Sequence, residues 1–356
     1  MAKILVAMSG GVDSSVAAML LKKSGHEIKG VFMKNYEPPA GFLSSCNWRG
    51  DQKDVERVCR KLKIPWETWN FTREYANKVL KPFYRAYQRG QTPNPDVLCN
   101  REIKFGLFLK RAKLAGFQLV ATGHYARVKK NSKGEVKLLC GKDKNKDQSY
   151  FLCALTQKQL QQVVFPVGGL LKEQVRELAK KYALPTAEKP DSQGICFVGE
   201  TNLAELLKGE IALKTGRILS ADGKILGQHR GLALYTIGQR HGLGISAHQP
   251  CYVAEKDYLK NSLVVVMGRK NSKLFHREVI AKDFSWLSNK TKPKKFFCQA
   301  RVRYRQPLKL CQVFVQGQRL KVSFAKPVWA PAAGQVIAFY KNQECLGGAI
   351  IESARP

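Results

Sequence analysis

The first 190 residues alternate between short apolar runs and longer segments whose apolar residues recur three and four positions apart. The apolar runs suit buried parallel strands at Ile4–Met8, Ile28–Met33, Trp66–Phe71 and Leu119–Thr122. Helical spacing is found in Val12–Lys23, Asp51–Leu62, Thr72–Arg89, Glu102–Ala115, Tyr150–Val164 and Lys172–Tyr182. This alternation predicts an α/β fold with a doubly wound parallel sheet and right-handed crossovers.

The pattern changes after the turn-rich segment at 190–194. A short helix is expected near Leu203–Leu207, and the glycine content rises from Lys214, which predicts a small, mostly β domain. From about Arg277 the chain reads as short strands separated by turns, typical of a compact barrel or sandwich. These strands are expected at Phe296–Tyr304, Leu308–Val315, Arg319–Phe324, Gln335–Tyr340 and Ala349–Ser353. We therefore expect three domains, at 1–200, 201–276 and 277–356.

The charge of the chain indicates a polyanionic partner. The 356 residues include 61 Lys and Arg against 27 Asp and Glu, a formal net charge of +34. Solubility requires a much smaller net charge. Nucleic acid is therefore the first partner to expect, and an anionic membrane surface the second. Residues 289–321 carry ten basic side chains and no acid, and residues 127–146 carry eight against two. A solvated strand face is the alternative interpretation of these runs.

No apolar run reaches the roughly 18 to 20 residues of a membrane span, and a strand-like segment begins at Lys3. These features predict a cytoplasmic protein with no membrane-spanning segment, signal peptide or transit peptide. Ten cysteines are scattered along the chain without a C-x-x-C pair, which weighs against a structural zinc site or an iron–sulfur cluster. We expect no protein-held metal centre, and mostly buried thiols in a reducing compartment.

The most specific chemical signal is the loop Ser9-Gly10-Gly11-Val12-Asp13-Ser14-Ser15, between the first strand and the first helix. Its glycines allow close backbone approach, and the free N–H groups of the helix N-terminus favour a phosphate. Asp13 can accept from a turn amide or help to hold Mg²⁺. The alternative interpretation, a glycine turn that only caps a helix, explains the two glycines but not the position of the loop between a strand and a helix. No Walker A sequence occurs in the chain.

Two cysteines have a context that suggests reactivity. Cys99 follows the stiff Thr92-Pro93-Asn94-Pro95-Asp96 loop, and Asn100 is expected to cap the next helix, so the helix dipole would favour a Cys99 thiolate. Asp96 is a candidate acid or base. A lone cysteine is more often core filler. Cys196, in a glycine-flanked apolar run, stays undecided on its chemistry alone.

Two polar segments follow the strand-like and helical runs. Gly123 and His124 come directly after the strand at 119–122, where loops of α/β sheets line ligand sites, although a structural histidine is the alternative. Lys146-Asp147-Gln148 precedes a helix, as a capping segment or a substrate loop.

Taken together, these motifs resemble a known family. The loop is similar to that of the ATP pyrophosphatase (PP-loop) superfamily. Eight ordered pieces resemble the bacterial tRNA-specific 2-thiouridylases (MnmA, also called TrmU): SGGVDSS at 9–15, TPNPDVLCN at 92–100, ATGHYARV at 121–128, KDQSYFL at 146–152, GICFVGE at 194–200, YTIGQRHGLGI at 235–245, RVRYRQ at 301–306 and CLGGAII at 345–351. The resemblance runs nearly end to end. The acidic loop common in members is poor in acids here, between Asn35 and Asp51.

The resemblance implies an enzyme that replaces O2 of the wobble uridine, U34, by sulfur in the anticodon loop of the tRNAs for Lys, Glu and Gln. It implies ATP and Mg²⁺, release of AMP and pyrophosphate, and a sulfur-donor or relay protein. It also implies an N-terminal ATP pyrophosphatase domain, a small central domain and a C-terminal β-barrel that contacts tRNA. Whether free sulfide or a persulfide attacks C2 stays open.

The family's residue roles carry over onto matching positions. Cys99 would be the nucleophile and Cys196 the persulfide carrier, with a Cys99–Cys196 disulfide after transfer. The residues implied to bind ATP are Ala7, Met8, Ser9, Gly10, Gly11, Val12, Asp13, Ser14, Met33 and Gly123. Those implied to receive the target base are Asn94, Pro95 and Asp96. Those implied to touch tRNA are His124, Lys146, Asp147, Gln148, Arg303, Tyr304 and Gln335.

Two alternatives remain at this stage. Another superfamily enzyme, such as a lysidine synthetase or an argininosuccinate synthase, would share Ser9–Ser15 but needs no distant pair of cysteines. A basic tRNA-binding protein with a purely structural loop would release no AMP or pyrophosphate.

Overall fold

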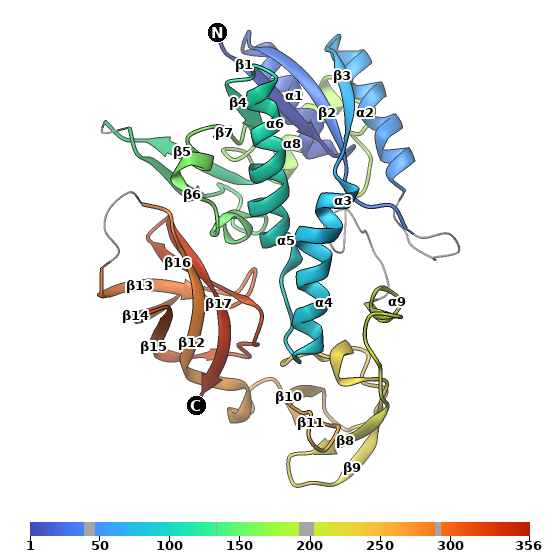
Figure 1. Ribbon diagram of the computed structural model, residues 1–356, viewed down its shortest axis with the longest axis vertical. Helices are drawn as coiled ribbons and strands as arrows, with labels where there is room; N and C mark the ends of the chain where they lie inside the picture. Colours follow the sequence, from blue (N-terminus) through green and yellow to red (C-terminus); the bar gives the residue numbers. More distant parts are fainter. Residues whose placement is uncertain (39–46, 133, 192–202, 289–292) are drawn as a thin grey trace.

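The computed structural model describes residues 1–38, 47–132, 134–191, 203–288 and 293–356. Within these ranges the N-terminal region contains a five-stranded parallel sheet in the order β3-β2-β1-β4-β7 (Figure 1). Its strands are β1 (Lys3–Met8), β2 (Glu27–Lys34), β3 (Trp66–Asn70), β4 (Leu119–Ala121) and β7 (Val163–Val164). The strand order reverses between β1 and β4, so a ligand crevice is expected outside the carboxyl ends of these two strands.

Helices cover both faces of this sheet because its strands are apolar on both sides. Leu5 and Ala7 of β1 share a buried cluster with Phe83 and Phe108, whereas Val6 shares the opposite cluster with other helices. The helical elements of this region are α1 (Val12–Lys23), α2 (Trp48–Leu62), α3 (Thr72–Tyr75), the π-helical η1 (Ala76–Leu80), α4 (Lys81–Gln88), α5 (Pro95–Leu98), the π-helical η2 (Cys99–Phe108), α6 (Leu109–Leu114) and α8 (Lys172–Lys181). The predicted doubly wound α/β architecture is confirmed.

The predicted helix over residues 150–164 is wrong. That stretch contains the 3₁₀ turn η3 (Ser149–Leu152), the short helix α7 (Gln157–Leu160) and strand β7. Thr156 breaks the helical run because it starts a new helix with a reciprocal capping box to Gln159. Val163 pairs with Val120 of β4, so the β-branched end of the segment extends the parallel sheet.

A hairpin of the N-terminal region crosses over to the C-terminal barrel. Strands β5 (Ala126–Lys130) and β6 (Val136–Cys140) pair with each other, and β6 pairs with β17 (Glu344–Arg355) through Leu138 and Leu139. Figure 1 shows this green hairpin reaching towards the red strands. Neither strand is predicted from the sequence, where this segment is notable only for its basic residues.

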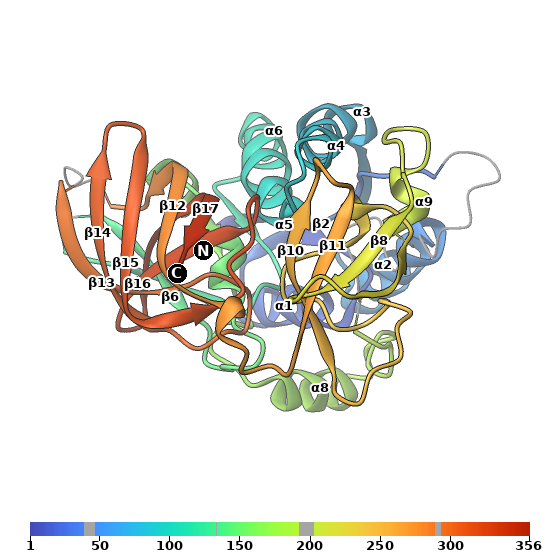
Figure 2. The ribbon, with the colours of Figure 1, turned by 90° about the horizontal axis from the view of Figure 1, so that it is seen from below.

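The central region forms a small sheet of its own in the order β10-β11-β8-β9, visible beside the barrel in Figure 2. Its elements are α9 (Leu203–Leu207), β8 (Gly216–Ser220), β9 (Ile225–His229), the 3₁₀ turn η4 (Leu232–Leu234), β10 (Cys251–Asp257) and β11 (Ser262–Met267). It lies at the C-terminal end of α4, where the Gln88 side-chain amide donates to the carbonyl oxygen of Glu210 at 3.1 Å. The expected short strands and the helix at 203–207 are confirmed.

The C-terminal strands close into an antiparallel barrel. Its elements are the 3₁₀ turn η5 (Ser272–Leu274), β12 (Phe275–Trp286), β13 (Lys295–Arg301), β14 (Lys309–Gln316), β15 (Arg319–Trp329), β16 (Val336–Lys341) and β17. The strands follow each other in the order β12-β15-β14-β13-β16-β17, and β12 pairs again with β17 to complete the barrel. Buried Val279, Val313 and Phe339 fill its interior. Of the two predicted architectures, the barrel is therefore the one present.

None of the helices within the described ranges combines the length and apolar character that crossing a membrane requires.

Candidate active site

The loop between β1 and α1 lies at the carboxyl edge of the parallel sheet. Gly10 has a φ of +76°, and a Cβ atom there would lie 2.6 Å from the carbonyl oxygen of Asp51, so only glycine fits without strain. The Ser14 hydroxyl accepts from the Ser9 amide at 3.2 Å and donates to the Gly11 carbonyl at 3.0 Å. Helix α1 has no side-chain N-cap, because Gly11 occupies that position. The first amides of α1 are thus suited to an anionic ligand.

The residues around this loop pack closely. A Cβ atom on Gly123 would lie 2.6 Å from the Ser14 amide nitrogen, so the backbone after β4 is in close contact with the loop. Val12 at the start of α1, Met8 on β1 and Met33 on β2 are all buried. The structure therefore brings together the sequence-predicted loop, Met33 and Gly123 around the reversal point of the strand order.

A cluster of charged side chains borders the loop, and sequence reasoning missed most of it. Asp13 Oδ1 accepts from the Tyr125 hydroxyl at 2.8 Å and lies 2.7 Å from Lys172 Nζ. The same Nζ lies 2.8 Å from Asp191 Oδ1. Burial and the negative charge of Asp13 raise the pKa of Tyr125, so its phenol stays protonated. Lys172 stands 159 positions from Asp13, and no local motif linked the two residues.

The loop that precedes Cys99 is organised differently from the prediction. The Asn94 side chain, not that of Asn100, caps the helix, accepting from the Val97 amide at 3.2 Å. Asn100 lies inside the helical segment and donates to the Phe151 carbonyl at 3.2 Å. The prediction of Asn100 as N-cap is therefore wrong: the helix begins earlier, because proline is accepted at its first position, Pro95. Cys99 lies one turn inside, where the helix dipole acts less strongly.

Cys99 is buried in the core on one face of the parallel sheet. It is 1 % exposed and belongs to the same buried cluster as Ala7 and Met33. Asp96 and Asn94 are half-buried at the start of α5. Cys196, the other predicted reactive cysteine, falls in the segment 192–202, outside the described residues. The proximity of the two thiols therefore stays a prediction.

His124 has a packed environment in this structure. It is 8 % exposed, its Nδ1 forms a 2.7 Å hydrogen bond with the Thr122 hydroxyl, and its ring packs against both Phe105 and Phe165. Burial, together with the charge of Lys104, holds the pKa of His124 well below its usual range. The imidazole is thus neutral near pH 7, as expected of the structural histidine that the sequence also allowed.

The segment Lys146–Gln148 connects several parts of the molecule. Lys146 Nζ lies 2.6 Å from Asp191 Oδ2, and the Gln148 side chain accepts from the Tyr125 amide at 3.0 Å. Asp147 is buried, accepts from the Gly141 and Ser149 amides, and faces Arg301 of the barrel at 3.4 Å. The carboxylate therefore fixes the segment against the barrel.

Arg303, Tyr304 and Gln335 lie on the barrel side of the same region. Burial lowers the pKa of Arg303 to about 10, and its guanidinium donates to the Ile237 carbonyl and lies over the Trp329 ring at 5.5 Å. The Tyr304 ring packs against Phe151 at 4.5 Å. Gln335 Nε2 donates to the carbonyl oxygens of Thr92 at 2.9 Å and of Pro93 at 3.3 Å.

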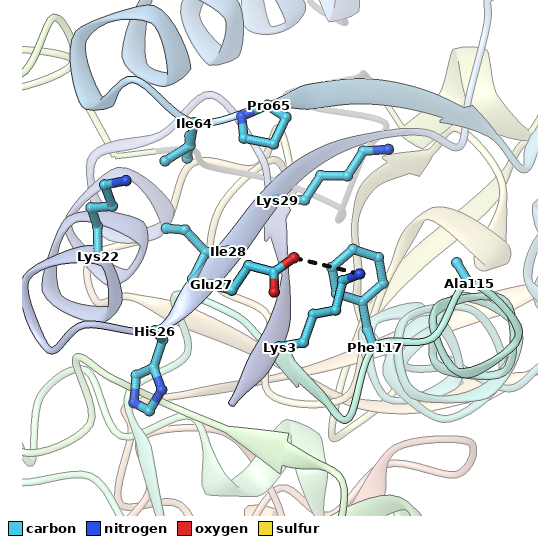
Figure 3. A pocket seen from close by; sticks show the side chains of 10 residues that line it. All are labelled: Lys3, Lys22, His26, Glu27, Ile28, Lys29, Ile64, Pro65, Ala115 and Phe117. Atoms are coloured by element: carbon cyan, nitrogen blue, oxygen red, sulfur yellow. Dashed lines mark ion pairs between the residues drawn. The ribbon is translucent and has the colours of Figure 1, made fainter. Parts of the chain in front are cut away.

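Two cavities differ in their relation to these residues. A cavity of about 170 Å³ lies between the Asn94 loop and the barrel, and is lined by Pro93, Asn94, Arg101 and Val336 among others. Figure 3 shows a larger one of about 450 Å³ with Lys3, Glu27 and Phe117 in its wall. Because Lys3 begins β1 whereas Ser9 follows its end, that larger cavity lies at the opposite edge of the sheet from the loop.

Three family models together match most of the chain. Residues 2–200 match the "tRNA methyl transferase HUP domain", residues 204–267 the "tRNA methyl transferase PRC-barrel domain" and residues 276–351 the "Aminomethyltransferase beta-barrel domain". The parallel sheet and its glycine loop thus belong to the HUP class of α/β domains.

Similarity to individual proteins is more specific. The tRNA-specific 2-thiouridylase MnmA of Alkaliphilus oremlandii is 46 % identical over 354 residues, covering 98 % of this chain and 97 % of that protein. MnmA of Listeria welshimeri is 46 % identical over 353 residues, covering 99 % and 95 %. A solved 4-thiouridine synthetase–RNA complex with bound ATP shares 21 % identity over 56 % of this chain and 46 % of that one, at a TM-score of 0.37. The chain belongs to the family of tRNA-specific 2-thiouridylases, MnmA.

Proposed function

We propose that this protein is an ATP-dependent tRNA-uridine 2-sulfurtransferase. It converts the wobble uridine U34 of the tRNAs for Lys, Glu and Gln to 2-thiouridine, with AMP and pyrophosphate as the other products. The observation that supports the proposal is that Cys99 belongs to the same buried cluster as Ala7 and Met33, two residues of the proposed nucleotide site. A nucleophile that shares a core with a phosphate-binding site suits an activated-carbonyl reaction.

ATP is the activating substrate in this proposal. The C2 carbonyl of uridine lacks a leaving group, and attack of its O2 on the α-phosphorus makes one by releasing pyrophosphate. The amides at the start of α1 and the Ser9 and Ser14 hydroxyls would stabilise the charge on the departing phosphates. Ala7, Met8, Gly10, Gly11, Val12, Asp13, Met33 and Gly123 complete the proposed nucleotide site.

Mg²⁺ is proposed as the partner of the ATP phosphates. The described residues contain no cluster of three or more His, Cys, Asp or Glu side chains that could hold a metal by themselves. Mg²⁺ in nucleotide sites is bound through one or two carboxylates, water and substrate phosphates. Asp13 would supply the carboxylate, and the ion would neutralise phosphate charge.

The target base is proposed to enter beside Asn94, Pro95 and Asp96. The neighbouring 170 Å³ cavity supports this choice, because it is lined by Pro93, Asn94 and Val97 and lies between the helix and the barrel. An anticodon base must leave its stack to enter such a space, and the unstacking costs a few kcal/mol, offset by phosphate contacts. Asp96 directly follows Asn94 and Pro95, and we propose it as the acid or base that acts on the uridine.

Sulfur transfer is proposed to use two thiols. A donor or relay protein loads a persulfide on Cys196, and its terminal sulfur forms a bond to C2 while AMP leaves with the former O2. The Cys99 thiolate attacks the inner sulfur, and the sulfur–sulfur bond breaks with its electron pair retained by the thiocarbonyl sulfur. A Cys99–Cys196 disulfide remains, and an external thiol supplies the two electrons that reduce it. If sulfide is released first, the same disulfide forms.

The tRNA is proposed to lie across the barrel and the edge of the N-terminal region. Arg303, Tyr304 and Gln335 of the barrel and His124, Lys146, Asp147 and Gln148 of the N-terminal region are the proposed contacts. The net charge of +34 supports a polyanionic partner of this size. Exposed Arg305 suits phosphate binding best, because the Arg303 guanidinium already donates to the Ile237 carbonyl, and His124 and Asp147 are buried. The proposed domain limits remain 1–200, 201–276 and 277–356.

One experiment tests this function directly. Unmodified tRNA is incubated with the protein, ATP, Mg²⁺ and a sulfide or persulfide source, and its nucleosides are analysed by mass spectrometry. We expect 2-thiouridine at position 34 with one AMP and one pyrophosphate per sulfur. AMP and pyrophosphate without sulfur in the tRNA would favour a different PP-loop enzyme, and neither product would favour a binding protein.

A further inference from the structure

Two cysteines face each other inside the C-terminal barrel. Cys298 of β13 and Cys311 of β14 are direct partners in the antiparallel register, and their sulfur atoms lie 3.5 Å apart. Both thiols are free and buried, with exposures of 7 % and 4 %, in the cluster that fills the barrel. The two sulfur atoms are therefore in contact, and a further approach of roughly 1.5 Å would bring them to the length of a disulfide bond.

The strand geometry allows that approach. Directly opposite residues of an antiparallel pair have Cβ atoms about 4.5–5.5 Å apart, and a disulfide needs about 3.5–4.5 Å. Rotation of the two side chains and a small approach of the strands cover the difference. Cys251 of β10, by contrast, is buried in the central region, where its sulfur contacts the carbonyl oxygen of Gln249. Burial alone thus does not bring two thiols together, whereas the register of β13 and β14 does.

The pair lies at the base of the loop formed by residues 302–308, between β13 and β14. Residues 303–305 of this loop include the barrel arginines and the tyrosine that we assign to tRNA binding. Cys298 and Cys311 are 13 positions apart in the chain, so a bond between them would close a ring that contains the whole loop. Such a ring restricts the conformations that the enclosed segment reaches when the two strands separate.

We propose that Cys298 and Cys311 are a modification site, a dithiol that an oxidant converts reversibly to a disulfide, and that this disulfide locks the β13–β14 hairpin at the base of its loop. The inference rests on the proposed function only in that the loop is a tRNA contact. The bond differs from the proposed Cys99–Cys196 disulfide, which forms during each sulfur transfer, because it lies within the barrel and needs no substrate.

Hydrogen peroxide is a sufficient oxidant for this site. The sulfur of Cys298 attacks the peroxide, the O–O bond breaks, and a sulfenic acid and one water are formed. The sulfur of Cys311 then attacks the sulfenic sulfur, the S–O bond breaks, and a second water leaves. Two thiols thus lose two electrons and two protons, and one peroxide becomes two waters. The hydrogen bond with Cys298 and burial raise the pKa of Cys311, so Cys311 keeps its proton and the first step is assigned to Cys298. Because both thiols are buried, the reaction is slower than that of an exposed cysteine.

Peptide mapping of the full-length protein tests the bond. The folded protein is incubated with hydrogen peroxide, the peroxide is removed with catalase, and free thiols are blocked with N-ethylmaleimide in urea. Cleavage by trypsin after lysine and arginine then gives the peptides 296–301 and 310–319, each with one of the two cysteines. We expect these peptides as a disulfide-linked pair that an added dithiol separates. Cys251 is the internal control, and its peptide should carry the maleimide.

Amide hydrogen exchange tests the lock. Oxidation should slow the exchange of the β13 and β14 amides by about tenfold, because the ring opposes separation of the two strands, and exchange in β10 and β11 should not change. A dithiol should restore the original rates in the same sample, so this comparison needs no variant. Cys298→Ala and Cys311→Ala should each lose both the linked peptides and the slower exchange. Cys251→Ala, at a buried cysteine outside the barrel, is the matched control and should respond as the wild type does.

The outcomes are distinct, and neither measurement needs tRNA, ATP or a sulfur source. If peptides 296–301 and 310–319 stay unlinked in the folded protein while the partly exposed Cys140 is oxidised, the site is overturned. Linkage that occurs only in urea, or that joins Cys298 mainly to another cysteine, would overturn it as well. Linked peptides with unchanged exchange would overturn the lock. If the bond and the slower exchange both occur but no sulfur enters tRNA, the proposed function fails while the dithiol site stands.

Discussion

The Gln335 amide of the barrel donates a 2.9 Å hydrogen bond to the Thr92 carbonyl at the start of the loop that carries Asn94. A second bond joins the two segments in the reverse direction, from the Thr92 amide to the Ala333 carbonyl at 2.8 Å. Gly334 lies between them with a φ of +89°, and a Cβ atom there would be 2.9 Å from the Thr92 nitrogen. The barrel therefore holds the loop of the proposed base site, in addition to its proposed contact with tRNA.

Replacing Gln335 should reveal this positioning role. Gln335→Leu keeps the size of the side chain but leaves the Thr92 and Pro93 carbonyls without this donor, at a cost of about 1–3 kcal/mol in the free energy of unfolding. We expect the single-turnover rate of thiolation to fall at least tenfold, a larger factor than the rise in the tRNA dissociation constant that loss of the proposed tRNA contact would cause. Urea unfolding, filter binding and nucleoside analysis give the three quantities. A large loss of tRNA affinity at an unchanged rate would make Gln335 a tRNA contact only.

The two-thiol mechanism predicts equal effects at two distant positions. Cys99→Ser or Cys196→Ser should each abolish thiolation, because a hydroxyl can neither carry the persulfide nor form the disulfide, while tRNA affinity stays within about twofold. Cys140→Ser, at a partly exposed cysteine outside the proposed site, is the matched control and should retain activity. The measurement is 2-thiouridine per tRNA. Full turnover by either of the first two variants would exclude the mechanism.

The parallel sheet was predictable because β1 and β2 are mostly apolar runs, and each is followed by a segment with helical spacing. The helix over 150–164 was not, since the segment divides between two partners: Tyr150 and Leu152 pack in the cluster shared with the barrel, and Val163 pairs with Val120 of the parallel sheet. Spacing along the chain cannot distinguish one partner from two. Thr156 followed by Gln159, a capping box, was the available signal for a break.

The candidate site was predictable to the extent that it is local in sequence. The glycine loop and the Cys99 loop are continuous motifs, so the residues themselves indicated them. The Asp13–Lys172–Asp191 bridge joins three regions of the chain, and one lysine among many in a chain of net charge +34 gives no signal. The capping role of Asn94 had a signal, since proline directly after an Asn marks a helix start. The sequence predicts Asn100 as the N-cap instead, because helical spacing becomes clear only after that residue.

Two arginines of the barrel should contribute to the salt dependence of tRNA binding. Arg303→Gln combined with Arg305→Gln should weaken binding and reduce the slope of log K against log salt by about one unit per lost phosphate contact. Arg319→Gln is the control, because Arg319 is exposed on the same barrel but already pairs with Glu352 at 2.8 Å. Affinities measured between 50 and 300 mM salt, roughly the range where such slopes are linear, give the comparison. A slope equal to that of the control variant would place the tRNA on another face.

Acid should destabilise the protein through His124. Its folded pKa lies well below 6.5 because the ring is buried near Lys104, so the unfolded chain binds a proton below about pH 6.5 that the folded chain does not. Stability therefore rises with pH in this window, and the contribution of one such group is at most about 1.4 kcal/mol per pH unit. Above pH 6.5 His124 is neutral in both the folded and the unfolded state, so it no longer makes stability depend on pH.

The measurement is the urea unfolding free energy at pH 7, 6 and 5, for the wild type and for His124→Asn. The variant should lose stability at pH 7, since the packed ring is removed, but its stability should fall less steeply between pH 6 and pH 5. His229 and His276, whose pKa values burial also lowers, leave a residual slope that both proteins share. His241→Asn, at an exposed position, should keep the full wild-type slope. Parallel curves for wild type and His124→Asn would mean that the folded protein protonates His124, and that its buried, neutral environment does not persist in solution.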